Sequence, residues 1–333
     1  MKRDSHIIES DQNPAVVVGQ IPMPPGLKSK VAMLPGAMVL HRLLKNFRYW
    51  SDSRRRTVGG VKRAQMSGRE AVGYTKSIYQ KIDRMVMRYG GWGNKKILEI
   101  GPGDSLGTGL WCLGAGATSY QAIDRFAVEL DRDFEDKVFA AIKAEMLPAD
   151  RDRCREVVEV VMGTDLDVSN FLYKNDLPIE MAPAVLGRSR YDVIFSNAVL
   201  EHVGNLEGTL RAMWELLVPG GVMFHDVDLR SHQTFENHPL HFLEYPQGLW
   251  RWMSSHNGEP NRVRMPGYLQ ILDGLGFENI DTGISHVFDN DLVTKNRGRL
   301  ALEFRHLSIE ELRPAVFWFT CRKSCSKSEP PRV

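Results

Sequence analysis

The chain has 333 residues and a formal net charge of +2 at pH 7, which argues against attraction of the whole protein to nucleic acid. This length suffices for one large domain with elaborations, and a hydrophobic share of 43% is ordinary for a soluble globular protein. The four cysteines are scattered without Cys-x-x-Cys spacing, so the sequence predicts no zinc site and a reduced, cytoplasmic protein.

Residues 1–90 are predicted to form an N-terminal arm followed by a helical cap. Residues 1–30 combine prolines with polar side chains, which favours an extended arm, and they lack the apolar core of a signal peptide. Apolar spacing predicts helices over 37–50 and 69–89. The first of these helices carries an apolar face formed by Leu40, Leu43, Leu44 and Phe47. No apolar run in the chain is long enough to span a bilayer.

Residues 91–323 alternate between short apolar runs and amphipathic segments, a pattern typical of a parallel sheet with right-handed helical crossovers. The predicted strands cover residues 96–100, 119–123, 157–162, 192–196, 222–227, 277–284 and 314–321. The predicted helices between them cover residues 127–145, 205–217 and 266–275.

Residues 228–265 are longer than the connection that such a sheet requires after its fifth strand. They contain Trp250 and Trp252, and this aromatic content argues against disorder. We call this segment the insertion and expect it to form part of a substrate pocket. Residues 324–333 are polar and are expected to be a flexible tail.

The most informative motif follows the first predicted strand and reads Glu99-Ile100-Gly101-Pro102-Gly103-Asp104-Ser105-Leu106-Gly107. Glycines let the backbone approach a nucleotide-like ligand closely. The dinucleotide fingerprint Gly-x-Gly-x-x-Gly is not matched, because Leu106 stands at its third glycine position. Glu99 would repel a pyrophosphate, so the turn favours a ligand that carries positive charge.

This turn resembles the acid-x-Gly-x-Gly motif of the class I S-adenosylmethionine-dependent methyltransferases. Three later segments resemble further motifs of that family in the same order, namely residues 119–124, 191–203 and 217–224. The resemblance implies an α/β fold with a Rossmann-like, seven-stranded, mostly parallel sheet and helices on both faces. It also implies S-adenosyl-L-methionine as the cofactor. A doubly wound domain that binds another nucleotide, or a fold without activity, is the alternative.

The resemblance also implies which residues bind the cofactor. Gly101 and Gly103 would admit its methionine end, Glu99 would hold the turn, and Asp124 would accept hydrogen bonds from both ribose hydroxyls. Asp165 would contact the adenine amino group, although Asp167 competes for that role and a turn or helix cap is the alternative. The full predicted set is Glu99, Gly101, Pro102, Gly103, Asp124, Arg125, Asp165, Leu166 and Asn197.

Four residues near the ends of the fourth and fifth predicted strands are candidates for catalysis: His202, Asp226, His225 and His232. A hydroxyl acceptor must lose a proton during methyl transfer, and an imidazole such as that of His202 can take it. Asp226 could orient that ring. Local packing of His202 is the alternative. The spacing of carboxylates and histidines is not diagnostic of a metal site, and none is predicted.

Arginines bear on the acceptor's charge. Arg262 and Arg264 end the insertion, and Arg54, Arg55 and Arg56 precede the second helix. Arginine pairs with carboxylates and phosphates, which makes an anionic acceptor one option and a solvated basic surface the other.

The sequence thus predicts a methyltransferase that acts on a small molecule or glycan, most readily on oxygen. The alternatives are N- or C-methylation of a small metabolite, methylation of RNA or protein, and a non-enzymatic binding scaffold. The absence of a zinc module or base-stacking motif weighs against RNA.

Overall fold

The computed structural model describes residues 16–18, 37–51, 68–126, 130–154, 161–162, 170–231, 239–255 and 259–326. Its strands are β1 (Val16–Val18), β2 (Lys96–Ile100), β3 (Ser119–Ile123), β4 (Val161–Met162), β5 (Phe171–Lys174), β6 (Tyr191–Asn197), β7 (Leu217–Asp228), β8 (Phe277–Phe288) and β9 (Pro314–Lys323). In the described part of the chain these strands form one nine-stranded sheet with the order β1-β8-β9-β7-β6-β2-β3-β5-β4.

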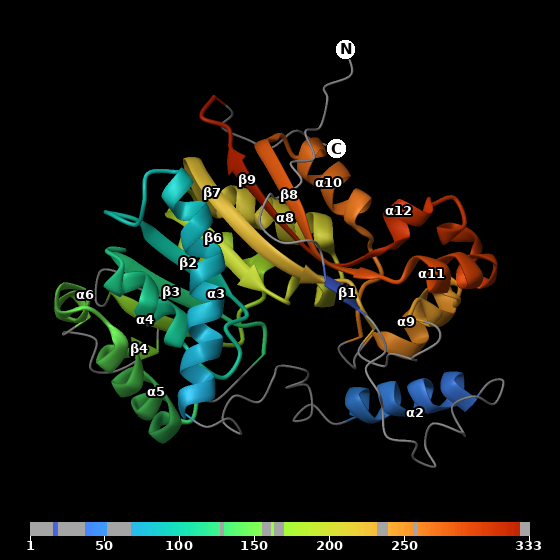
Figure 1. Ribbon diagram of the computed structural model, residues 1–333, viewed down its shortest axis with the longest axis horizontal. Helices are drawn as coiled ribbons and strands as arrows, with labels where there is room; N and C mark the ends of the chain where they lie inside the picture. The colour runs from blue at the N-terminus through green and yellow to red at the C-terminus, as the bar shows by residue number, and fades with distance from the viewer. Residues whose placement is uncertain are drawn as a thin grey trace.

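The sheet confirms the predicted α/β class (Figure 1). β2 pairs in parallel with β3 and β6, and β6 pairs in parallel with β7. β9, the last predicted strand, lies antiparallel between β7 and β8, as expected. β1 and β5, which were not predicted, bring the sheet to nine strands within the described residues.

The predicted strand over residues 157–162 is described only at Val161 and Met162, and the strand that pairs with β3 on the side away from β2 was not predicted. β5 occupies that position, and β4 pairs with the outer side of β5. The Phe171-Leu172-Tyr173 run of β5 is buried against β3 and supplies the apolar surface that this interior position needs. Its four residues gave too short a pattern to stand out in the sequence.

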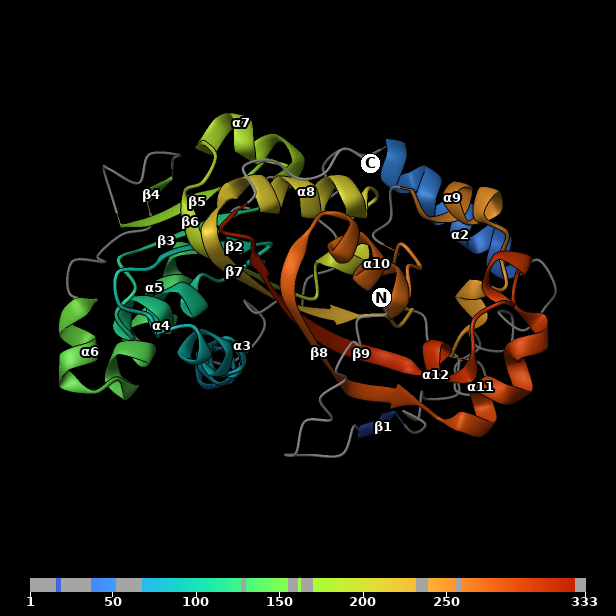
Figure 2. The same cartoon turned by 90° about the horizontal axis from the view of Figure 1, so that it is seen from above.

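The described helices are α2 (Ala37–Ser51), α3 (Gly68–Arg88), α4 (Gly107–Gly114), α5 (Arg132–Glu145), α6 (Pro148–Arg153), α7 (Ala182–Leu186), α8 (Leu206–Leu216), α9 (Gln247–Ser254), α10 (Met265–Gly274), α11 (Asn290–Asn296) and α12 (Ile309–Leu312). One face of the sheet is covered by α3, α4 and α5, and the other by α7, α8 and α10 (Figure 2). Alternate residues of each strand therefore enter two separate cores. In β2, Ile97 joins the first core and Leu98 the second.

A third apolar cluster lies beyond the ends of β8 and β9 and is built from α2, α9, α11, α12 and the 3-10 turn η5 (His241–Leu243). We call this group the side lobe; Figure 1 shows it apart from α3–α6. The insertion supplies η5 and α9, and residues 289–313, a second long connection, supply α11 and α12. This second connection was not predicted, because its apolar residues, such as Val293, Leu300 and Leu312, follow no sustained period.

The structure changes the face that was predicted on the first helix: of its four apolar residues only Leu43 packs, partly buried, against the side lobe. In α2, Leu40, Leu44 and Phe47 are largely exposed, whereas Arg42 and Asn46 are buried. Several polar interactions hold the buried face, among them contacts of Arg42. Arg42 Nη1 forms an ion pair with Glu259 Oε2 at 3.0 Å, and its guanidinium lies 4.9 Å from the Trp250 ring centroid.

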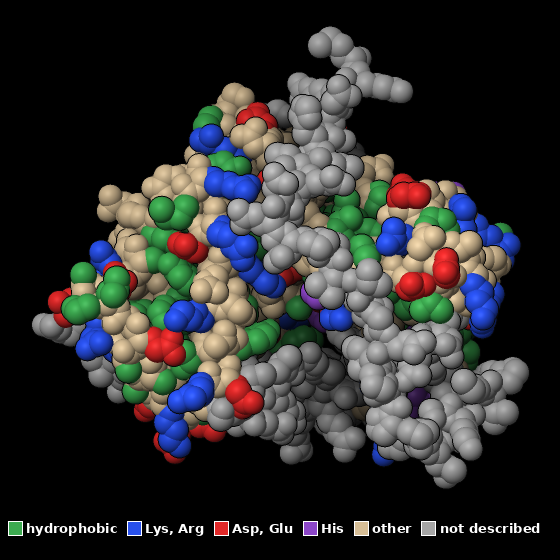
Figure 3. Space-filling view, viewed as in Figure 1, with side chains coloured by type: hydrophobic (Ala, Val, Ile, Leu, Met, Phe, Trp, Pro, Cys, Tyr) green, Lys and Arg blue, Asp and Glu red, His purple; other side chains and the backbone are tan. Residues whose placement is uncertain are grey.

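Figure 3 shows acidic and basic side chains over both the α3 side and the side lobe. Within the described ranges, no helix has the length and apolar character needed to cross a membrane.

Candidate active site

The glycine turn lies at the carboxyl end of β2, where open α/β sheets bind ligands. Gly101 and Gly103 have φ of +66° and +74°, in the left-handed region that favours glycine. A Cβ on Gly101 would lie 2.7 Å from Cγ2 of Val199, which belongs to the loop after β6. Pro102 is buried between the two glycines. The turn therefore depends on glycine and packs directly on the β6 loop.

Glu99 anchors the strand that leads into this turn. Its side chain is buried, and the hydroxyl of Tyr120 on β3 donates a hydrogen bond to Oε2 at 2.5 Å. Burial, with the nearby Glu99 carboxylate, raises the pKa of Tyr120 well above its usual value, so the phenol keeps the proton that it donates. This contact ties β2 to β3 just before the turn, and the role of Glu99 in holding the turn stays a prediction.

Asp124 follows β3 at the same edge of the sheet. Its Oδ1 accepts a hydrogen bond from the N–H of Phe126 at 2.9 Å, and burial raises the pKa of its carboxyl. The Gly101 N–H donates to the Ile123 carbonyl at 2.9 Å, which fixes the glycine turn beside Asp124. Arg125, next in the chain, is exposed.

Asn197 ends β6, directly opposite Asp226 of β7 in the strand register. Its Nδ2 donates to the Tyr74 hydroxyl of α3 at 3.4 Å. Ala198 then takes a φ of +55° and donates its N–H to the Asp226 carbonyl at 2.9 Å. This sharp turn leads into η4 (Leu200–His202), which carries the predicted base.

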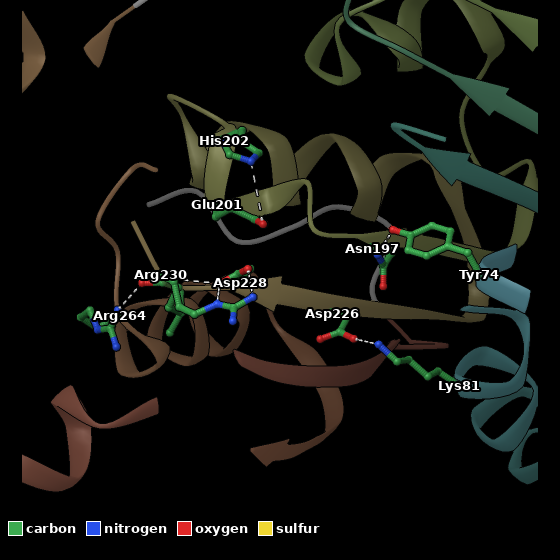
Figure 4. Close-up of polar contacts among 10 residues, drawn as sticks. Tyr74, Lys81, Asn197, Glu201, His202, Asp226, Asp228, Arg230 and Arg264 are labelled. Atoms are coloured by element: carbon green, nitrogen blue, oxygen red, sulfur yellow. Dashed lines mark hydrogen bonds and ion pairs between the residues drawn. The ribbon is translucent and has the colours of Figure 1, made fainter. Parts of the chain in front are cut away.

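The predicted pairing of His202 with Asp226 is absent, as Figure 4 shows. Asp226 instead forms an ion pair through Oδ2 with Lys81 of α3. His202 is 25% exposed, and its Nε2 lies 3.9 Å from Oε1 of the adjacent Glu201. The physical reason is that the turn at Ala198 and η4 carry His202 away from the strand register, while α3 brings a cation to Asp226.

His225 lies in the core. Its ring is fully buried, its Nδ1 is 2.7 Å from the Ser196 Oγ, and its centroid is 5.1 Å from that of Phe319. Burial lowers the pKa of this imidazole to about 3, so it is neutral at physiological pH. This placement argues against a role for His225 as a general base.

Two further carboxyls lie near these residues. Glu201 is fully buried, and burial, together with Asp228 and Asp226, raises its pKa well above the usual value. Asp228 uses both oxygens on Arg230, accepting from Nε at 2.8 Å and from Nη2 at 2.7 Å. Both carboxylate oxygens of Asp228 therefore already have a donor in Arg230.

The arginines predicted to bind an anionic acceptor are occupied by internal contacts. Arg264 is buried and donates to the carbonyls of Leu229 at 2.9 Å, Leu312 at 3.0 Å and Pro314. Burial lowers its pKa to about 10. Arg264 therefore joins backbone segments that are far apart in the sequence, and its role is structural. The prediction that it binds an anionic acceptor is wrong.

Arg262 is also buried, at a φ of +71°. It donates to the Tyr245 carbonyl at 2.5 Å, and its guanidinium lies 5.2 Å from the centroid of the Trp250 ring. These contacts of Arg262 join elements of the side lobe.

Several predicted residues lie outside the described part of the chain: Arg54, Arg55, Arg56, Asp165, Leu166 and His232. Sequence reasoning missed Tyr74 and Lys81, which contact Asn197 and Asp226. Their seven-residue spacing, which places both on one face of α3, was the signal available. Among described residues, no three His, Cys, Asp or Glu side chains gather in a way that could hold a metal ion.

Comparison with known proteins adds to this geometry. A family model described as "Methyltransferase domain" matches residues 74–282. A curated relative, trans-aconitate 2-methyltransferase of Deinococcus radiodurans, is 33% identical over 103 residues, which cover 29% of this chain and 39% of the relative. The matched stretch thus spans about two fifths of that relative's length.

Solved structures resemble the chain only distantly. Geranyl diphosphate C-methyltransferase of Streptomyces coelicolor has a TM-score of 0.41 at 10% identity, covering 73% of this chain and 76% of its own. A putative methyltransferase of Bacillus halodurans has a TM-score of 0.40 at 13% identity, covering 74% and 99%. TM-scores this low decide nothing about substrate or mechanism. The family model, however, covers more than half of the sequence, and the chain belongs to the class I S-adenosylmethionine-dependent methyltransferase family.

Proposed function

We propose that the protein transfers a methyl group from S-adenosylmethionine to a hydroxyl oxygen of a small molecule or glycan. The cofactor supplies a methyl group already activated on a sulfonium. The protein's work is then to bind the cofactor, to place the acceptor in line with the methyl group and to remove the hydroxyl proton.

The residues at the carboxyl edge fit this cofactor. Gly101 and Gly103 present backbone without a Cβ, in conformations that other residues rarely adopt. Asp124 offers a carboxylate at the end of the neighbouring strand, suited to two ribose hydroxyls. Asn197 ends β6, on the other side of β2, and would reach the amino-acid end. We assign cofactor binding to these four residues and Glu99.

The placement of His202 carries the proposal for the acceptor. Val199 packs against Gly101, and the N–H of His202 donates to the Val199 carbonyl at 2.9 Å. A partly exposed imidazole therefore lies one 3-10 turn from the proposed cofactor loop. We assign His202 as the base that takes the hydroxyl proton.

The surroundings of η4 support an acceptor pocket built from distant segments. Asn261, near the end of the insertion, donates its N–H to the Glu201 carbonyl at 2.6 Å and its Nδ2 to the Leu200 carbonyl at 2.9 Å. On the other side, Tyr74 of α3 contacts Asn197. We propose that the insertion and α3 wall the acceptor on opposite sides.

A labelled-methyl assay tests this function. S-adenosylmethionine with a labelled methyl group is offered with a panel of phenols, sugars, primary amines and trans-aconitate, and with a deproteinised small-molecule cell extract. We expect label on oxygen. We also expect His202→Ala to lower kcat on the order of a hundred- to ten-thousand-fold while binding of S-adenosylhomocysteine is retained.

The matched control is His306→Ala, which removes an exposed histidine of the side lobe and should leave turnover unchanged. Label found only on nitrogen or carbon would contradict O-methylation. Near-normal turnover by His202→Ala on a hydroxyl acceptor would remove His202 as the base.

A further inference from the structure

Asp226 differs from the other carboxylate on its face of β7. Asp226 and Asp228 are two residues apart and share one face of the strand. Asp228 uses both oxygens on Arg230. Asp226 uses Oδ2 on Lys81, while Oδ1 is buried and has no hydrogen-bond partner among the described residues. Only one of these two carboxylates therefore has an oxygen left for another donor.

Leaving that oxygen without a donor is unfavourable. The Asp226 side chain is 6% exposed, and a buried acceptor without a partner loses its hydration without compensation, the more so when it is charged. Buried polar groups of this kind are pointers to a ligand or bound water that completes them. A hydroxyl or amine of an acceptor is a donor of the required type.

The position of Asp226 fits this reading. It lies opposite Asn197 in the register of β6 and β7, about 5 Å away by the spacing of neighbouring strands. Asn197 is the residue that we assign to the amino-acid end of the cofactor, next to the sulfonium. The acceptor must lie within reach of that sulfonium, so Asp226 is placed on the acceptor's side.

Lys81 approaches this edge from α3. Tyr74 and Lys81 are two helical turns apart on one face of α3, and they contact Asn197 and Asp226 respectively, as Figure 4 shows. The Lys81 side chain is 42% exposed, so its ammonium can move while it remains hydrated. One face of α3 thus contacts both β6, at Asn197, and β7, at Asp226.

We propose that Lys81 is a positioning residue for methyl transfer: its ion pair orients the Asp226 carboxylate so that Oδ1 accepts a hydrogen bond from the reacting acceptor. This inference rests on the proposed methyltransferase function. Lys81 does not touch the reacting atoms. It acts by fixing one oxygen of Asp226, leaving the other to hold the acceptor in line with the methyl group.

The test compares Lys81→Met, Lys81→Arg and Asp226→Asn in the full-length protein, using the panel and extract of the labelled-methyl assay. Lys81→Met should lower kcat about ten- to a hundred-fold, because small misplacements of a reactant cost this much. Lys81→Arg should recover most of the rate. S-adenosylhomocysteine affinity and KM for S-adenosylmethionine should stay within about two-fold of wild type for both lysine variants.

Lys76→Met is the matched control, since Lys76 lies on the same helix, its side chain is about as exposed as that of Lys81, and its ion pair is with Glu145. It should leave kcat unchanged. In the double variant of Lys81→Met and Asp226→Asn, kcat should fall no further than in the more impaired single variant, because the two residues act as one unit. Thermal unfolding of each variant shows whether it is folded at the assay temperature.

Three results separate the outcomes. If wild-type protein binds no S-adenosylhomocysteine or transfers no label, the proposed function fails. If label is transferred and Lys81→Met keeps kcat within two-fold, only the role of Lys81 fails. A Lys81→Arg variant no better than Lys81→Met, or fully additive losses in the double variant, would likewise overturn the positioning role.

Discussion

The core placement of His225 makes a quantitative prediction about stability. Burial lowers the pKa of this imidazole from 6.5 to about 3, so the unfolded chain binds a proton there that the folded protein does not. The stabilisation is therefore complete above about pH 6.5 and is lost as the pH falls toward 3. The loss is about 1.4 kcal/mol per pH unit within that window.

The perturbation is His225→Asn, which keeps a polar group near Ser196 but does not titrate. Unfolding by urea is measured for both proteins at about pH 7.5 and about pH 5.5. The variant loses packing against Phe319 and should be less stable at the higher pH. The difference in unfolding free energy between wild type and variant should be about 1.4 kcal/mol smaller at the lower pH, because only the wild type loses stability through protonation of His225 in its unfolded state.

Comparing the two proteins cancels the titration of every other group. A gap that stays constant between the two pH values would mean that His225 titrates normally in the folded protein. That result would refute its placement in the core and return it to the list of candidate bases.

Asp124→Asn should weaken S-adenosylhomocysteine binding about ten- to a hundred-fold by calorimetry, because hydrogen bonds to a charged group contribute roughly 1.5–3 kcal/mol; unchanged affinity would exclude its ribose role. Burial raises the pKa of Glu201, so stability should fall as the pH rises above about 4.5. Glu201→Gln should therefore gain stability over wild type with rising pH, and parallel curves would contradict this. Arg264→Met leaves three carbonyls without their donor and should destabilise the fold by about 2–4 kcal/mol, with acceptor KM unchanged. A raised acceptor KM at unchanged stability would instead restore its anion-binding role.

The part of the fold around the glycine turn follows closely from sequence. β2 and β3 have the bounds that were predicted. Each short apolar run is followed at once by a residue that favours a turn, Gly101 after β2 and Asp124 after β3. The φ values at Gly101 and Gly103 explain why glycine was needed there. These elements are set by local pattern, which a single sequence displays.

The side-chain partnerships around the candidate site did not follow from sequence. Arg264 looks like a free cation in the sequence, but three carbonyls from distant segments converge on it. Asp226 was matched with His202 because their strands are neighbours, yet Lys81 from a preceding helix forms its ion pair. Such choices depend on tertiary placement, which charge and spacing do not reveal.

We propose that the carboxyl edge of β2, β3 and β6 binds S-adenosylmethionine. Titration of S-adenosylhomocysteine into the wild-type protein by calorimetry tests it most directly. We expect saturable binding at one site and a raised melting temperature, with about 2.7 kcal/mol of added stability at a ligand concentration one hundred times Kd. Absence of both binding heat and thermal stabilisation in correctly folded protein would contradict it.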